Sequence, residues 1–198
     1  IYLQYGIHGS IIDEIKKYAK RYNIKLTQLS VQKFKVYGDY KSTQGVIGIK
    51  SEFEYLGIDE LIINAEKSKY PLILILDSVQ DPHNLGAIIR TAECAGVDGI
   101  ITTIKNSASV TNTVEKTSAG ATNYQKITRV NNLASTLDIL KNHGFWIVGS
   151  KLGESENYTT IDYKVPIALV VGNEERGIRH LIAKKSDFLA EIPMKGNI

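Results

Sequence analysis

The stretch PLILILDSVQDPHNLGAIIRTAECAG, residues 71–96, decides the fold. It opens with an apolar run, Leu72–Leu76, which contains no polar alternation and is closed by Asp77. A run of this kind is typical of a strand buried on both faces of a parallel sheet. Asn84 is then predicted to cap a helix that stops at Gly96, because apolar residues between them recur at helical spacing.

Arg90 lies off the apolar face of this predicted helix, and Gly86 precedes it by one turn on the same side. Glycine lowers helix stability, so its presence in the first turn of a helix requires an explanation. One interpretation is that a phosphate approaches the backbone at Gly86 and meets Arg90 one turn on. The alternative is a glycine of no consequence and a surface pair between Arg90 and Glu93.

Buried strands alternate with helices after this stretch, and this pattern predicts an α/β fold with a mainly parallel sheet. The predicted strands are Leu72–Leu76, Gly99–Ile104, Lys126–Val130, Phe145–Gly149, Ile167–Val171 and Phe188–Ile192. The predicted helices are Leu85–Ala95, Thr111–Ala119, Leu133–Asn142 and Ile178–Lys185. Ligands of such sheets bind beyond the carboxyl ends of the strands, so we expect the site there.

The chain divides by composition into three segments. Residues 1–50 predict a small α/β domain, with a helix from Ser10 to about Tyr22 and a basic outer face that is either simply solvated or an RNA contact. Residues 51–69 are acidic and weakly patterned, and we expect a partly helical linker. Residues 70–198 hold the alternating strands and helices and form the second domain.

Composition excludes several classes of protein. The chain has 198 residues, 43% of them hydrophobic, and a net charge of +3, which permits a nucleic-acid partner without requiring one. It shows no signal peptide and no apolar run of about 20 residues, and its single cysteine cannot form an internal disulfide. We therefore expect a cytoplasmic protein. One cysteine and four scattered histidines also predict no metal centre.

Three short motifs follow predicted strands: DPHNLG at 81–86 with Arg90 beyond it, GNEERG at 172–177 and IPMKGNI at 192–198. A further motif, KTSAGA at 116–121, lies between the first and the second of these. In this order and spacing they resemble the SpoU (TrmH-like) branch of the SPOUT methyltransferases, which methylate RNA on ribose 2′-oxygens. Residues 1–50, ending in Gln44, Gly45 and Val46, are similar to the substrate-binding domain of the subgroup that includes the 23S rRNA guanosine 2′-O-methyltransferase.

The resemblance implies a deep trefoil knot at the C-terminal end of the sheet, S-adenosylmethionine bound in that knot, and a homodimer. The implied active-site residues are Asn84, Arg90 and Glu174. The implied cofactor-binding residues are Gly172, Ser150, Ile192 and Met194. A basic rim that would contact RNA, together with the N-terminal domain, comprises Lys105, Lys116, Arg176 and Arg179.

Arginine is a poor base, because its pKa lies above about 12. We therefore expect Arg90 to bind a phosphate and stabilise the emerging alkoxide, with Asn84 positioning either the ribose or Arg90. Two alternatives stay open: the same chemistry on tRNA, and a non-catalytic RNA-binding or ribosome-assembly protein with this fold. The family continues beyond Gly196, Asn197 and Ile198 with a Ser-Leu-Asn segment and a helix, so we expect this chain to lack that tail and to be incomplete at its start.

Overall fold

The computed structural model describes residues 1–153 and 155–194, and it divides the chain into two compact units, 1–52 and 53–198. The first unit holds a three-stranded sheet in the order β2-β1-β3, with β1 parallel to β2 and antiparallel to β3. Its elements are β1 (Tyr2–Gln4), α1 (Ser10–Arg21), β2 (Thr27–Leu29), α2 (Val31–Phe34), α3 (Tyr40–Thr43) and β3 (Val46–Ile47). Leu3 and Phe34 are fully buried and anchor its small core.

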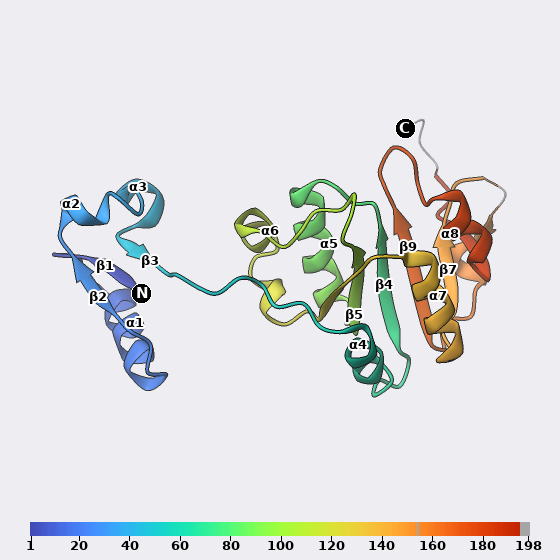
Figure 1. Cartoon of the computed structure of the whole chain (residues 1–198), viewed down its shortest axis with the longest axis horizontal. Helices are drawn as coiled ribbons and strands as arrows, with labels where there is room; N and C mark the ends of the chain where they lie inside the picture. Colours follow the sequence, from blue (N-terminus) through green and yellow to red (C-terminus); the bar gives the residue numbers. More distant parts are fainter. Residues whose placement is uncertain (154, 195–198) are drawn as a thin grey trace. The chain divides into compact units, whose positions relative to one another are not determined.

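The second unit is built on a seven-stranded sheet in the order β6-β5-β4-β9-β7-β10-β8, in which every neighbouring pair is parallel (Figure 1). Its strands are β4 (Leu72–Asp77), β5 (Gly99–Thr103), β6 (Ile127–Val130), β7 (Trp146–Ser150), β8 (Glu156–Asn157), β9 (Ile167–Gly172) and β10 (Phe188–Glu191). The mainly parallel α/β sheet predicted from the sequence is therefore confirmed. The sequence did not predict β8, a two-residue edge strand too short to carry a pattern.

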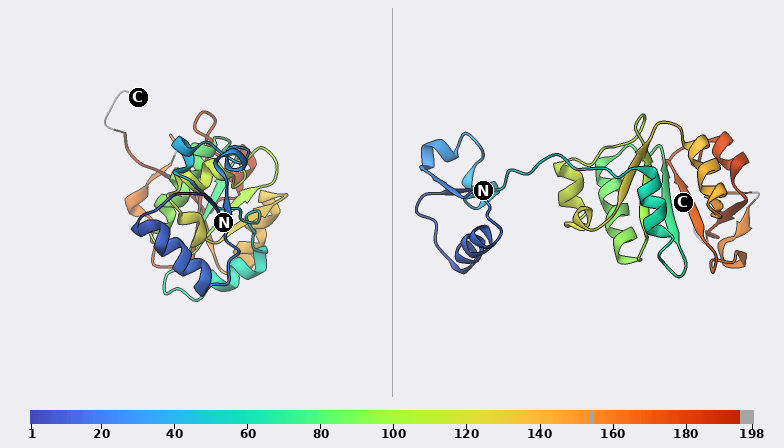
Figure 2. Two further views of the ribbon diagram at one scale, coloured as in Figure 1. Left: turned by 90° about the vertical axis from the view of Figure 1, so that its left-hand side faces the viewer. Right: turned by 60° about the horizontal axis from the view of Figure 1, so that its bottom comes forward.

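Helices cover both faces of this sheet, and Figure 2 gives two further views of the arrangement. The helical elements are α4 (Ile58–Ala65), α5 (Pro82–Cys94), α6 (Asn112–Thr117), η1 (Ala121–Asn123), α7 (Leu133–Asn142), η2 (Tyr158–Thr160) and α8 (His180–Lys185). On one face α4, α7 and α8 pack on alternate residues of β4, such as Ile73 and Ile75. On the other face α5 and α6 pack on Leu74 and Leu76. Because β4 is covered on both sides, its sequence is continuously apolar.

Helix α4 lies in the segment that we expected to link the two domains. Its residues Leu61, Ile62 and Ala65 are fully buried in the core formed with Ile73 and Ile101. Gly99 leaves room for this packing, since a Cβ there would come within 2.7 Å of the Leu61 side chain. Residues from 53 onward thus belong to the second unit. The acidic residues that suggested a linker lie on the exposed face of α4, as Asp59 and Glu60 do.

The first unit also holds the short helix α2, which begins at Val31. The Ser30 side chain accepts a hydrogen bond from the backbone N–H of Lys33. Serine at the N-cap satisfies a free N–H of the first turn, and this fixes where the helix begins.

Candidate active site at the carboxyl edge of the sheet

Because all seven strands run parallel, their carboxyl ends lie along one edge of the sheet, and the residues that follow them meet there. Strands β5, β4 and β9 are neighbours, and β9 is followed along the sheet by β7 and β10. Asn84 follows β4, Glu174 follows β9, Ser150 ends β7, and Ile192 follows β10. These four of the predicted catalytic and cofactor-binding residues therefore lie along a single edge of the sheet, whereas Arg90 lies further along α5.

Helix α5 begins earlier than predicted. Its N-cap is Asp81, whose carboxylate accepts a hydrogen bond from the N–H of His83 at 2.9 Å, and Pro82 occupies the first helical position. Proline suits that position because its missing N–H is not needed there. Asn84 is therefore a residue of the first turn and not the cap. Its side chain donates instead to Glu174 Oε1 at 2.5 Å, across 90 residues of sequence.

Asn173 shapes the loop that carries Glu174. Its side-chain oxygen accepts hydrogen bonds from the N–H groups of Glu175 and Arg176, at 3.0 and 3.3 Å. Its amide donates to Ser78 O at 3.3 Å and to Glu174 Oε2 at 3.1 Å. One side chain thus ties the loop after β9 to the residues after β4 and aims the Glu174 carboxylate at Asn84.

Gly172 closes β9 under this loop. A Cβ at Gly172 would overlap the backbone of Gly177 and Ile178, so only glycine permits the chain to fold back here. Asn173 and Gly177 exchange two backbone hydrogen bonds, of 3.1 and 2.9 Å, which close the turn. The glycine predicted to hold the cofactor through its backbone also has this structural role.

Arg90 is exposed on α5, as predicted, and its side chain makes no hydrogen bond or ion pair with the described residues. The structure gives Gly86 a different role from the one considered above. A Cβ at Gly86 would come within 2.7 Å of Thr117 Cβ and 3.0 Å of Val114 O, so helix α6 approaches the backbone there. Gly86 is buried under that helix, and a phosphate has no room at this position.

Asp77 and Arg179 form a structural pair at the same edge. Asp77 is fully buried, and its carboxylate accepts hydrogen bonds from Arg179 N at 2.8 Å and Arg179 Nε at 2.7 Å. The arginine side chain remains 54% exposed. Arg179, predicted to contact RNA, therefore also compensates a buried charge and holds the start of α8 against β4.

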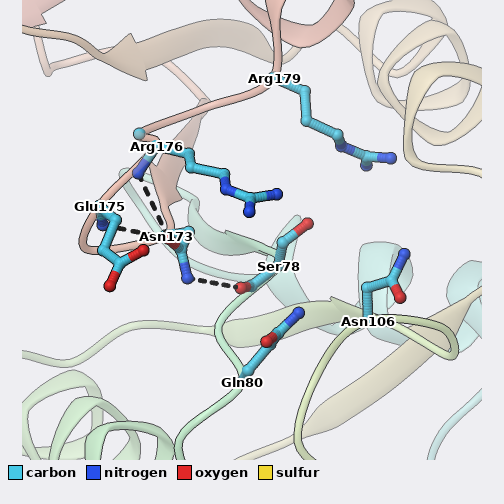
Figure 3. A pocket seen from close by; sticks show the side chains of 8 residues that line it. Ser78, Gln80, Asn106, Asn173, Glu175, Arg176 and Arg179 are labelled. Carbon is cyan, nitrogen blue, oxygen red and sulfur yellow. Dashed lines mark hydrogen bonds between the residues drawn. The ribbon is translucent and has the colours of Figure 1, made fainter.

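A polar pocket of about 340 Å³ lies beyond β4, β5 and β9 (Figure 3). Its lining residues are Ser78, Gln80, Asn106, Asn173, Glu175, Arg176, Gly177 and Arg179. Two of the predicted RNA-binding residues, Arg176 and Arg179, thus face one pocket. The other two, Lys105 and Lys116, are exposed but do not line it.

The residues at the ends of β9, β7 and β10 have side chains and backbone groups suited to the expected cofactor. Ile192 and Met194 leave their side chains 66% and 64% exposed directly after β10, and Ser150 is half-buried at the end of β7. Apolar side chains beside strand ends suit an adenosine, whose faces take apolar contacts and whose edges take backbone hydrogen bonds. These residues therefore fit S-adenosylmethionine. Residues 195–198 of this motif lie outside the described residues.

Sequence reasoning missed Ser78, Gln80 and Asn106, since it considered only the motifs of the resembled family. A signal was present: each is a polar residue in the loop that follows a strand of a parallel sheet. Within residues 1–153 and 155–194, no three His, Cys, Asp or Glu side chains are grouped to hold a metal ion. None of the helices in that part of the chain has the length and apolar character needed to cross a membrane.

Comparisons with known proteins agree with this geometry. Residues 71–198 match the model of the SpoU rRNA Methylase family. A protein of Staphylococcus aureus named as a TrmH family tRNA/rRNA methyltransferase is 38% identical over 202 residues, covering 100% of this chain and 80% of the relative. A Staphylococcus saprophyticus protein of the same name is 39% identical over 200 residues with the same coverage.

Solved structures share the fold. An rRNA methyltransferase of Sinorhizobium meliloti, crystallised with S-adenosylmethionine, is 25% identical with a TM-score of 0.73, covering 99% of this chain and 72% of that one. A TrmH/SpoU tRNA-modifying enzyme of A. aeolicus is 34% identical with a TM-score of 0.61, covering 71% and 72% of the two chains. The paired Asn84 and Glu174, the glycine turn after β9 and these matches lead to one conclusion: the chain belongs to the SpoU methylase family.

Proposed function

We propose that this protein transfers a methyl group from S-adenosylmethionine to a ribose 2′-hydroxyl of RNA, and that its target is a guanosine of 23S rRNA. The observation that carries the proposal is the hydrogen bond between Asn84 and Glu174. It joins two distant motifs at the edge where the ends of β9, β7 and β10 fit the cofactor. The S. meliloti relative, an rRNA methyltransferase with the same fold, binds S-adenosylmethionine.

The cofactor supplies a methyl group on a positively charged sulfur. The protein has to bring a 2′-oxygen to that methyl group and stabilise negative charge on the oxygen as its proton leaves. Arg90 carries a permanent positive charge with no competing partner among the described residues, so it is free to hold the adjacent phosphate and the emerging alkoxide. Asn84, fixed by Glu174, orients the ribose.

The distribution of charge supports RNA as the partner of the first unit. Residues 1–52 hold nine Lys and Arg against four Asp and Glu, a net charge of +5, while residues 53–198 have a net charge of −2. Positive charge attracts RNA through its phosphates. The rRNA methyltransferase of S. meliloti matches 99% of this chain, whereas the tRNA-modifying enzyme of A. aeolicus matches 71%. This difference in coverage favours rRNA over tRNA.

The knot and the homodimer belong to the same proposal. Strand β9 comes after β7 in the chain but lies between β4 and β7 in the sheet. A late strand that enters a gap left by earlier ones is the arrangement that a threaded C-terminal region requires. Light scattering of the purified protein tests the dimer, and a monomer that binds cofactor and methylates RNA would contradict it.

The test of the function is Arg90→Ala, compared with wild type for methylation of ribosomal RNA and for S-adenosylmethionine binding by calorimetry. We expect a loss of methyl transfer of about 100-fold or more, as for removal of one oxyanion donor, with cofactor affinity unchanged. Lys126→Ala removes an exposed cation before β6, at the opposite edge of the sheet, and should keep full activity. Unchanged turnover in Arg90→Ala contradicts its role, and no cofactor binding by wild type favours a non-catalytic protein.

A further inference from the structure

Several of the polar side chains that line the pocket in Figure 3 have no hydrogen-bond partner in the part of the chain that the structure describes. Among the described residues, the carboxamides of Gln80 and Asn106 and the guanidinium of Arg176 take part in no hydrogen bond or ion pair. They come from three different loops, after β4, β5 and β9, and extend into the same space. All three side chains are exposed to solvent, so it is their convergence from separate loops on one pocket that points to a ligand with several polar atoms.

Two of these loops contain a residue in an uncommon backbone conformation. Ser78 and Asn106 both adopt positive φ angles, 69° and 58°, which are uncommon for residues other than glycine. The carbonyl of Ser78 accepts the Asn173 amide, so the loops after β4 and β9 are tied together beneath the pocket. Such strained positions persist where the surrounding structure fixes them, and they cluster at ligand sites.

The side chains that line the pocket restrict the chemical class of ligand that it can bind. Arg179 is already paired with Asp77, but the guanidinium of Arg176 has no partner among the described residues, and a guanidinium in a pocket suits a phosphate group. Carboxamides offer a donor and an acceptor side by side, which matches the edge of a nucleobase. The volume of about 340 Å³ is in the range of small-ligand pockets. A flipped nucleotide of single-stranded RNA meets all three conditions.

We propose that this pocket receives one unstacked nucleotide of the RNA substrate, with its base edge against Gln80 and Asn106 and its phosphate against Arg176. The pocket would then select the nucleotide at the site of reaction, whereas the first unit supplies affinity that is independent of base identity. This inference rests on the proposed function, because it takes RNA as the substrate.

Four single-stranded RNA 12-mers that differ only in one central nucleotide, A, C, G or U, test the pocket by fluorescence anisotropy with the full chain at fixed salt. We expect wild type to prefer one central base by about 10-fold, the scale of one well-formed base contact. Gln80→Ala and Asn106→Gly should reduce the preference to less than about 2-fold. Glycine is chosen at 106 because it keeps the positive φ angle.

Asn142→Ala is the matched control, since it removes an exposed carboxamide at the end of α7, outside the pocket, and should keep the preference. Equal binding of the four RNAs by wild type, or a preference unaltered in both pocket variants, overturns the proposal. Methylation and cofactor binding are measured separately. If the base preference depends on Gln80 but no methyl transfer occurs, the proposal for the pocket stands and the proposed enzymatic function is rejected. If the protein methylates RNA but the pocket variants keep the preference, only the proposal for the pocket is rejected.

Discussion

Two arginines of one loop show how residues with the same charge differ in role. Arg179 donates to the fully buried Asp77 through both Nε and its backbone N–H. Arg176 lines the same pocket, but its side chain makes no hydrogen bond or ion pair with any described residue. A motif alone does not separate them, because both are basic residues in one short segment. Burial of the partner does separate them, since a buried carboxylate must be compensated.

Arg179→Ala should therefore destabilise the protein, whereas Arg176→Ala should not. Removing Arg179 deprives Asp77 of one of its hydrogen bonds and of its counter-charge, while the backbone N–H remains. We expect the free energy of unfolding to fall by about 2 kcal/mol, below the full effect of breaking a buried pair. Arg176→Ala should change it by less than about 0.5 kcal/mol.

Urea denaturation followed by circular dichroism measures both variants, and RNA affinity is measured beside it. Weaker RNA binding in both, with lower stability only in Arg179→Ala, is the expected pattern. Equal stability of the two variants would show that Asp77 does not depend on the arginine side chain.

At the scale of the elements, Gly86 of α5 sets the distance between this helix and α6. Gly86→Ala would normally stabilise a helix by about 1 kcal/mol. Here the new Cβ would come within 2.7 Å of Thr117 Cβ and 3.0 Å of Val114 O, and a backbone carbonyl cannot rotate away. We expect the free energy of unfolding to fall by about 1 to 3 kcal/mol, as in overpacked cores.

Thermal and urea unfolding of Gly86→Ala measure this effect. Gly48→Ala is the control, because nothing lies within 4 Å of a Cβ there and it should stay within about 0.5 kcal/mol of wild type. A stabilised Gly86→Ala protein would mean that α6 can move aside.

The elements also show what the sequence could predict. Apart from β8, the strands of the second unit were predicted to within about two residues, because mainly apolar runs have few alternatives. The start of α5 was wrong: Asp81 and Asn84 are both good caps, and only Pro82 at the first position decides between them. The packing of α6 on Gly86 could not be predicted, since it joins residues about 30 apart through a contact that leaves no periodic signal.

The candidate site was predicted in the same uneven way. Family motifs led to Asn84 and Glu174, which the structure brings together. They gave no role to Asn173, whose side chain makes four hydrogen bonds that build the loop. A hydrogen-bonding role of this kind depends on where neighbouring loops lie, and that follows from the strand order and not from local sequence.

At the scale of the whole molecule, the two units differ in charge. Residues 1–52 carry a net +5 and residues 53–198 a net −2. Each phosphate that a lysine neutralises releases counterions, so log affinity falls with log salt concentration by about 0.7 per contact for single strands. The proposal for the first unit thus predicts which lysines set the salt dependence.

Lys17→Ala and Lys20→Ala remove exposed cations of α1, and each should lower the slope of log affinity against log salt by about 0.7. The full chain is titrated with one single-stranded RNA at several salt concentrations. Lys126→Ala, an exposed lysine of the negatively charged second unit, should leave the slope unchanged. If Lys126→Ala lowers the slope and the α1 variants do not, RNA binds along the second unit. The positive charge of the first unit then has a role other than binding RNA. If all three leave it unchanged, the phosphate contacts are concentrated on the arginines of the pocket.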